Sequence, residues 1–124
     1  MKYGNKKMQI DGITFDSIKE ASRYAELKLL QRAGEIDKLE LQKEFELIPA
    51  QYEQLSREEY LKHKGKKTKG KLIERAVKYK ADFYYYDNRL KSFVCEDTKG
   101  FRTKEYIIKR KLMLYVYGIR IKEI

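Results

Sequence analysis

Three charged side chains in the second half of the chain have the types and the spacing for metal-dependent chemistry. Asp82 lies in the segment Tyr79–Tyr86, and both Asp97 and Lys99 lie in the segment Ser92–Gly100, after a turn of only five residues. Residues two apart on a strand point to the same face, so Asp97 and Lys99 project together, and Asp82 joins them if the segments pair as a hairpin. Two carboxylates beside a lysine form a Mg²⁺ site with a charged helper, which is the equipment of a phosphodiester-cleaving enzyme.

Two further acids lie near this set, and each has a structural as well as a chemical interpretation. Glu96 adjoins Asp97 but faces the opposite side of a regular strand, as an outward charge, unless a bulge turns it inward. Asp97 is preferred as the ligand because it shares strand parity with Lys99. Glu20 follows Ser17 by three residues, which is the spacing of a helix capping box, yet its carboxylate could also reach a cation at the sheet edge.

The elements that must position these residues follow from local sequence signals. Asp11-Gly12 between apolar residues predicts a hairpin turn, and the apolar spacing after Ser17 predicts a helix that ends before Gly34. The elements expected in chain order are a hairpin over 8–15, a helix over 17–33, strands over 36–41 and 43–48 that can form one bent strand, strands over 79–86 and 92–100, a helix over 103–117 and a strand over 119–124. The residues expected to face the core from the second helix are Ile107, Leu112, Leu114 and Tyr115. After the first hairpin, the order α-β-β-β-α-β indicates an α/β fold with a central mixed sheet flanked by helices.

Length and composition limit the class of protein. The 124 residues suffice for one domain with a single modest core, and a hydrophobic fraction of 42% argues against disorder. The net charge of +10, from 29 basic and 19 acidic residues, favours a polyanionic partner such as nucleic acid, with a solubilising surface as the alternative. A single cysteine, and no apolar run near the roughly 20 residues of a membrane span, favour a soluble cytoplasmic protein.

A basic insertion interrupts the predicted sheet over about residues 56–75. It contains six lysines within ten residues, together with two glycines and the single histidine, His63. We expect a mobile loop, entered by a short helix over 56–62, whose ammonium groups contact DNA phosphates; the alternative is an inert solvated loop. His63 is expected to be exposed and non-catalytic. The lysines expected to bind DNA are Lys62, Lys64, Lys66, Lys67, Lys69 and Lys71.

An ordered set of motifs resembles one enzyme family. From the N-terminus, the set is Ser17-x-x-Glu20, Gln42-x-x-Phe45-x-Leu47, Ala81-Asp82-Phe83, Glu96-Asp97-x-Lys99-Gly100, Thr103, Tyr106 and Lys109-x-Lys111. Over about residues 10–124 the chain resembles the PD-(D/E)XK nuclease superfamily, and within it a phage-type branch with Holliday-junction-resolvase-like members. An isolated acid-x-Lys motif is common by chance, but this ordered set is not. The resemblance implies a restriction-endonuclease-like core with the first acid on the second core strand and the acid-x-Lys motif on the third.

The resemblance also implies roles for individual residues. Asp82, Asp97 and Glu20 are expected to bind Mg²⁺ or Mn²⁺. Lys99 is expected to orient or help deprotonate the attacking water, or to stabilise the transition state. These four residues form the expected catalytic set.

The remaining motif residues each have a chemical and a structural interpretation. Gln42 could contact the scissile phosphate or face solvent, and Thr103 could contact phosphate or only cap a helix. Glu96 could be an accessory residue of the site or a charge on the sheet. Lys109 and Lys111 could bind backbone phosphates or be ordinary charges on a helix surface.

The function expected from this resemblance is metal-dependent cleavage of DNA at four-way junctions or other branched structures, in a bacterial host cell. Resolving a junction requires two symmetric cuts, so this substrate implies a homodimer. One alternative is a nicking, restriction or repair endonuclease. The alternative from another class is a non-catalytic nucleic-acid-binding module with a nuclease fold.

Overall fold

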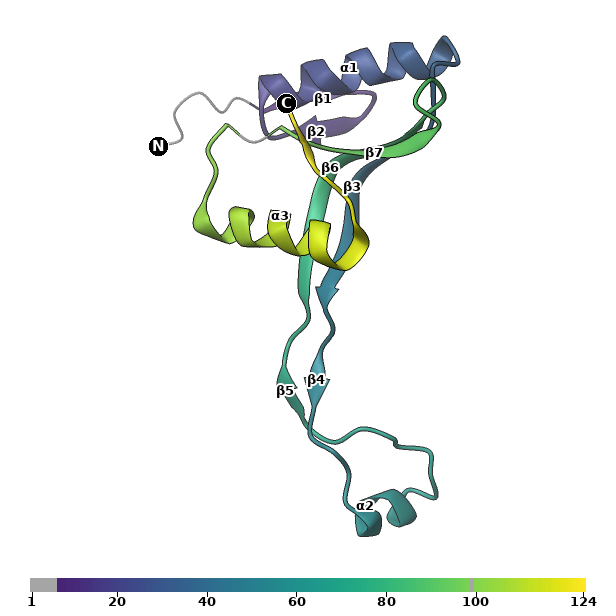
Figure 1. The fold of residues 1–124 in the computed structure, drawn as a ribbon, viewed down its shortest axis with the longest axis vertical. Coiled ribbons are helices and arrows are strands. Elements are labelled where there is room, and N and C mark those ends of the chain that lie inside the picture. The colour runs from purple at the N-terminus through teal and green to yellow at the C-terminus, as the bar shows by residue number, and fades with distance from the viewer. Residues whose placement is uncertain (1–6, 99) are drawn as a thin grey trace.

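The structure, a computed structural model, describes residues 7–98 and 100–124, and its body is built on a four-stranded mixed sheet (Figure 1). The strands lie in the order β3 (Ile36–Ile48), β6 (Val77–Asp87), β7 (Ser92–Asp97) and β8 (Lys122–Glu123). β6 pairs antiparallel with both β3 and β7, whereas β8 pairs parallel with β7. The predicted mixed α/β class and the predicted order of helices and strands in the body are therefore confirmed.

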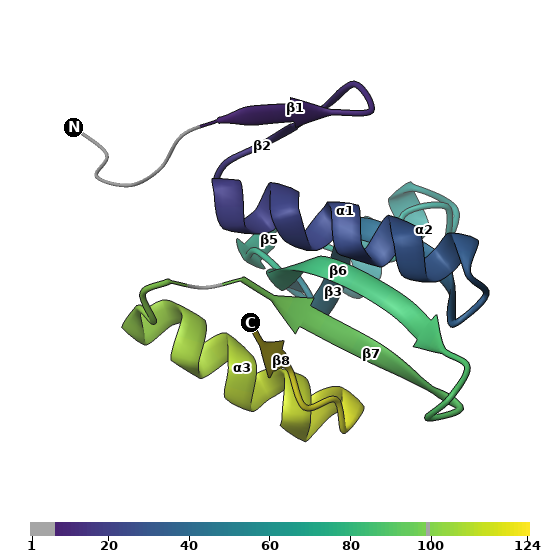
Figure 2. The ribbon, with the colours of Figure 1, turned by 90° about the horizontal axis from the view of Figure 1, so that it is seen from above.

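Two helices cover different parts of this sheet (Figure 2). The helix α1 (Ile18–Arg32) packs with the hairpin of β1 (Met8–Ile10) and β2 (Ile13–Phe15), and the helix α3 (Lys104–Tyr117) packs near β8. The core beneath α1 consists of Phe15, Ala21, Tyr24, Leu27, Ile36, Phe83 and Tyr85. The core beneath α3 consists of Phe45, Leu47, Tyr79, Ala81, Cys95, Tyr106, Met113 and Ile121. Within the described ranges, none of the helices is both long and apolar enough to traverse a lipid bilayer.

Side-chain caps and a left-handed glycine determine where these helices begin and end. The Ser17 hydroxyl accepts a hydrogen bond from the Glu20 N–H at 3.1 Å, and the Thr103 hydroxyl accepts one from the Tyr106 N–H at 3.0 Å. Gly118 ends α3 with a φ of 68°, a conformation that glycine adopts without steric cost. Both helices begin as predicted, and the helix-cap interpretation of Thr103 is confirmed.

The strand β3 is one continuous, bent strand rather than two. Lys38 and Gln42 lie inside it with φ values of 57° and 54°, in the left-handed region that non-glycine residues rarely adopt. The partner strand β6 packs against both cores: Phe83 belongs to the core beneath α1, whereas Ala81, two residues earlier, belongs to the core beneath α3. Asp82 lies between these two residues, where the strand passes from one core to the other.

Beyond the body, β3 and β6 continue into a long arm formed by residues 49–76 (Figure 1). In the arm, β4 (Gln51–Tyr52) pairs with β5 (Leu72–Glu74), and the short helix α2 (Arg57–Lys62) lies at the far end. The short helix agrees with the sequence prediction, whereas the two strands were not predicted. The basic insertion is therefore a two-stranded projection with its lysines at the end farthest from the body.

Two predictions about the C-terminal part need correction. Leu114 and Tyr115 are 51% and 88% exposed, because α3 turns Met113 toward the core instead. The last strand covers only Lys122–Glu123, which is shorter than the predicted six residues. The start of that segment is used to finish the helix, since the Ile119 N–H donates to the Met113 carbonyl at 3.3 Å.

Glu96 is fully buried beneath α1, which corrects the expectation of an outward charge on the sheet. Its carboxylate accepts hydrogen bonds from Arg23 Nε at 2.8 Å, from Arg23 Nη2 at 2.6 Å and from the Tyr85 hydroxyl. Burial, and then the hydrogen bond to Glu96, raise the pKa of Tyr85, so its hydroxyl stays protonated and donates. Glu96 and Asp97 still face opposite sides of β7, as alternation requires, but a helix covers the side of Glu96. The Arg23–Glu96 ion pair thus attaches α1 to β7.

Replacing Arg23 with methionine tests this attachment. In Arg23→Met the Glu96 carboxylate stays buried without its cation, and we expect the free energy of unfolding to fall by about 3–5 kcal/mol. The double variant Arg23→Met/Glu96→Met should recover most of that loss, because apolar side chains of similar size can replace a buried ion pair. Urea denaturation measures both, with Arg32→Met at the exposed end of α1 as the control. A loss below about 1 kcal/mol for Arg23→Met, the value of a surface pair, would show that the ion pair does not attach the helix.

Candidate active site

An open pocket with a volume of about 240 Å³ lies where the beginning of α1 meets β6 and the end of β7. Its lining is acidic and polar, and consists of Asp16, Ser17, Glu20, Asp82, Asp97, Thr98 and Gly100. The three carboxylates that the sequence selected, from one helix and two strands, therefore line one pocket. The hairpin that was expected to bring Asp82 and Asp97 together is present, with Phe83 paired to Glu96 in the residues that adjoin them.

Asp82 is held in place by the residue that follows Asp97. One of its oxygens, Oδ2, accepts hydrogen bonds from both the N–H and the hydroxyl of Thr98, each at 2.8 Å. The other oxygen, Oδ1, lies 3.4 Å from the amide nitrogen of Gln42. Thr98 is the residue between the acid and the lysine of the acid-x-Lys motif, so this motif also orients the first acid.

Gln42 connects two of the carboxylates. Its side-chain nitrogen lies 3.4 Å from Glu20 Oε1 as well as 3.4 Å from Asp82 Oδ1. The residue is solvent-exposed and has a left-handed backbone in the middle of β3, which is a conformation that persists only where the surrounding structure requires it. Gln42 is therefore exposed to solvent and lies beside two carboxylates, while its contact with a phosphate stays a prediction.

The backbone of Glu20 takes part in the helix cap, and its side chain lines the pocket. Its N–H donates to Ser17, while its buried carboxylate lies beside Asp82. Burial, the hydrogen bond with Asp82 and the charge of Asp82 raise the pKa of Glu20 from 4.5 to about 7, against the lowering effect of a backbone hydrogen bond from Asp16. The pocket therefore brings together like charges that a cation would neutralise.

Asp97 is the most buried acid of the pocket, with 1% of its surface exposed. Its Oδ2 accepts a hydrogen bond from the hydroxyl of Tyr79, a core residue of β6. Burial, and then the hydrogen bond to Asp97, raise the pKa of this tyrosine, which keeps it a donor. Tyr79 also lines a neighbouring pocket of about 200 Å³ together with Thr103 and Lys109.

The donor chemistry of the pocket fits a hard divalent cation. Carboxylate oxygens are the ligands that Mg²⁺ and Mn²⁺ prefer, and Glu20, Asp82 and Asp97 are the residues that would hold such an ion. Across residues 7–98 and 100–124, no three His, Cys, Asp or Glu side chains are already gathered closely enough to hold a metal ion. The three acids line one pocket, and the hydrogen bonds of Gln42 and Tyr79 occupy positions on their oxygens.

The structure brings together some of the predicted residues and separates others. Lys99 lies outside the described residues. Glu96 lies on the other side of β7 and does not line the pocket. Lys109 pairs with Glu105 at 3.6 Å, and Lys111 lies farther along α3, beside a separate pocket that Arg110 and Arg120 also line. The lysines of the insertion are on the arm.

Sequence reasoning missed several residues that shape this site. Tyr79 and Thr98 orient the two strand acids, and Asp16 adds another carboxylate beside Glu20. Asp16 could have been found because it directly precedes the helix cap, and Thr98 because it lies inside the acid-x-Lys motif. Nothing in the sequence pairs Tyr79 with Asp97, since their contact depends on how the bent strand approaches β7.

The fold and the pocket define a mixed α/β protein with an acidic pocket beneath the start of α1. Residues 1–122 match a protein family described as "Protein of unknown function (DUF1064)", and the chain belongs to this family. A search of curated proteins found no match. A search of solved structures also found none.

Replacing Glu20 with glutamine tests whether the pKa of Glu20 is raised in the folded protein. Because the pKa of Glu20 in the folded protein, about 7, is above its ordinary value of 4.5, the folded state is favoured by protonation at low pH and loses that stability as the pH rises through 7. Glu20→Gln should therefore stabilise the metal-free protein by about 1–3 kcal/mol at pH 8 and change little at pH 5. Thermal unfolding at both pH values measures this, with the exposed Glu46→Gln as control. Equal effects at pH 5 and pH 8 would mean that the pKa of Glu20 is not raised in the folded protein.

Proposed function

We propose that this protein is a metal-dependent, structure-selective DNA endonuclease with a restriction-endonuclease-like core, related to the phage-type, Holliday-junction-resolvase-like branch of the PD-(D/E)XK superfamily. The observation that supports this most strongly is the shared pocket of Glu20, Asp82 and Asp97. These acids come from α1, β6 and β7, the elements on which the resemblance expects them. The net charge of +10 favours a polyanionic substrate.

The pocket residues have separable tasks in this proposal. Asp82, held by Thr98, and Asp97, held by Tyr79, present fixed carboxylates, and Glu20 completes the oxygen donors from the helix side. When bound there, Mg²⁺ or Mn²⁺ supplies charge neutralisation at the phosphate and lowers the pKa of the attacking water. Pre-orientation of the carboxylates reduces the reorganisation needed at the moment of reaction.

Lys99 and Gln42 complete the proposed site. Lys99 follows Asp97 by two residues, and its proposed role as the cation that orients water or stabilises the transition state depends on the motif. The Gln42 amide, 3.4 Å from both Glu20 and Asp82, can donate to a non-bridging phosphate oxygen or to the attacking water at the same place.

The charge pattern favours catalysis over simple binding. A surface that only binds DNA gains nothing from like-charged acids in a pocket, because they repel phosphate. Here burial, together with the hydrogen bond and the charge of Asp82, raises the pKa of Glu20 to about 7, and a divalent cation would convert the same pocket into an attractive one. Maintaining such a pocket on a basic protein is best explained by a metal-dependent reaction on a phosphate backbone.

Cleavage of labelled DNA tests the reaction class. The protein should cut branched DNA in Mg²⁺ and not in EDTA, and Asp82→Asn, Asp97→Asn and Lys99→Ala should each slow cleavage by about 100-fold or more. The exposed Asp37→Asn and Arg32→Ala remove charges of the same sign away from the pocket and should cut like the parent. If the three site variants cut as fast as the parent, the site assignment is wrong. DNA binding without any Mg²⁺-dependent cleavage would support the non-catalytic module instead.

Substrate structure is tested separately from the reaction class. A four-way junction should be cut at least about tenfold faster than linear duplex of the same sequence, which corresponds to about 1.4 kcal/mol of discrimination. The two nicks should be symmetric, and sedimentation should show a homodimer on the junction. Equal rates on junction and linear duplex would defeat junction selectivity and favour a nicking, restriction or repair endonuclease.

A further inference from the structure

The basic charge of the arm is concentrated at its end. We define the tip as residues 56–71 and the leg as residues 49–55 and 72–76. The tip contains seven basic and two acidic side chains, and the stretch 62–71 contains no acid at all. The leg contains one basic and two acidic side chains. The cationic tip is thus separated from the basic body by a leg whose net charge is −1.

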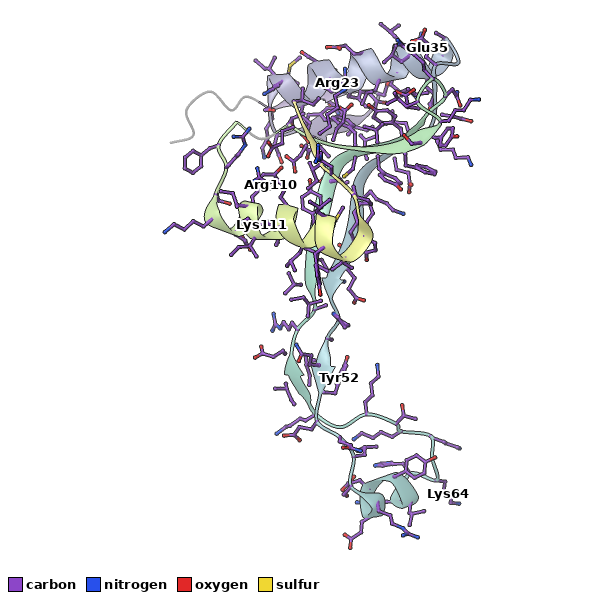
Figure 3. All side chains as sticks on the ribbon, in the orientation of Figure 1. Arg23, Glu35, Tyr52, Lys64, Arg110 and Lys111 are labelled. Carbon is purple, nitrogen blue, oxygen red and sulfur yellow. The ribbon has the colours of Figure 1, made fainter. Side chains whose placement is uncertain are left out.

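The two strands that lead from the pocket into the arm determine how far the near end of the tip lies from the pocket. One strand runs ten residues from Asp82 back to Leu72, and the other runs ten residues from Gln42 forward to Tyr52. At about 3.3 Å per residue in extended backbone, both give a reach of roughly 30–35 Å. Figure 3 shows Tyr52 partway along the arm and Lys64 at its far end, well away from Arg23 on α1. The tip therefore lies about 30 Å or more from the carboxylate pocket.

The tip is a folded unit that is attached to the leg. Ser56 caps α2 by accepting a hydrogen bond from the Glu59 N–H at 3.2 Å. The backbone of Glu53 in the leg pairs with the last two residues of the tip. Its N–H donates to the Lys71 carbonyl at 2.8 Å, and its carbonyl accepts from the Gly70 N–H at 2.9 Å. A Cβ on Gly70 would lie 2.5 Å from the Glu53 carbonyl oxygen, so this contact requires glycine.

One lysine of the tip is further positioned by an aromatic ring of the leg. Lys69 Nζ lies 4.8 Å from the centroid of the Tyr52 ring, within the range of a cation–π interaction. This contact, together with the backbone pairing of Glu53, fixes the end of the lysine-rich stretch against the leg. Lys69 is thus held at a set distance from the body.

We infer that the tip binds the phosphates of duplex DNA about one helical turn away from the phosphate that lies in the carboxylate pocket. This inference rests on the proposed endonuclease function. One turn of B-DNA is about 34–36 Å long, and phosphates recur on the same side of the duplex at that interval. The reach to Tyr52 matches this interval, and Lys69 lies over the Tyr52 ring at that point. Lysine ammonium groups suit phosphates without reading sequence. The arm then requires a duplex of at least about ten base pairs on one side of the cut.

A comparison of arm lengths and tip charges tests this inference. Junctions with arms of about 20 and about 6 base pairs bracket the one-turn distance, and binding is measured in EDTA so that no strand is cut. The tip variant is Lys67→Gln/Lys69→Gln/Lys71→Gln, at the end of the tip that lies beside Tyr52 and Leu72. The control variant, Arg32→Gln/Lys38→Gln/Lys91→Gln, removes the same charge from exposed positions on the body.

On long arms, the tip variant should bind at least about tenfold more weakly than the parent, with a salt slope reduced by about 2–3. On short arms, the parent should weaken to the level of the tip variant, and the tip variant should weaken little further. The control variant should keep the arm-length dependence of the parent.

Cleavage of the long-arm junction by the parent in Mg²⁺ separates this inference from the proposed function. If the parent cuts, but the tip variant shows the same dependence on arm length as the parent, the tip does not bind DNA one turn away and this inference alone is wrong. If the parent neither binds nor cuts DNA, the proposed function and this inference both fail.

Discussion

The buried ion pair between Arg23 and Glu96 is the interaction on which the site depends, because it attaches α1 to β7. Each partner lies close in sequence to an acid of the pocket: Glu20 precedes Arg23 by three residues, and Asp97 directly follows Glu96. The contact that secures the helix therefore also sets how far the helix acid lies from the strand acids. The ion pair on one side of β7 thus keeps the Glu20 carboxylate buried beside Asp82 on the other side, and this burial, with the hydrogen bond and charge of Asp82, raises the pKa of Glu20.

The elements that the sequence predicted well are those determined by local chemistry. The turn at Asp11-Gly12 and the caps at Ser17 and Thr103 are each fixed by one or two residues and their immediate neighbours. Asp82 and Asp97 could be placed at one site because strand alternation and a short turn leave little freedom in a hairpin.

The remainder depends on contacts between elements distant in the sequence. Alternation placed Glu96 opposite Asp97, but only the position of α1 shows that this opposite side is buried. The left-handed backbone of Gln42, which lies beside two carboxylates, has no local signal, since glutamine does not favour that conformation. Tyr115 was expected in the core from its apolar character and is 88% exposed, because α3 buries a narrower stripe than its composition suggests. For the arm, the positive charge could be predicted from the sequence. Its length could not, because it depends on the pairing of strands on either side of the basic stretch.

A crystal structure of the protein with Mn²⁺ tests the central claim most directly, because anomalous scattering locates the metal independently of activity. We predict a peak in contact with the carboxylates of Asp82 and Asp97, with Glu20 bound to the ion directly or through water. A pocket that stays without a peak at saturating Mn²⁺, with Gln42 and Tyr79 still bonded to its acids, would contradict the claim. Such a result would mean that the three carboxylates are not a metal site.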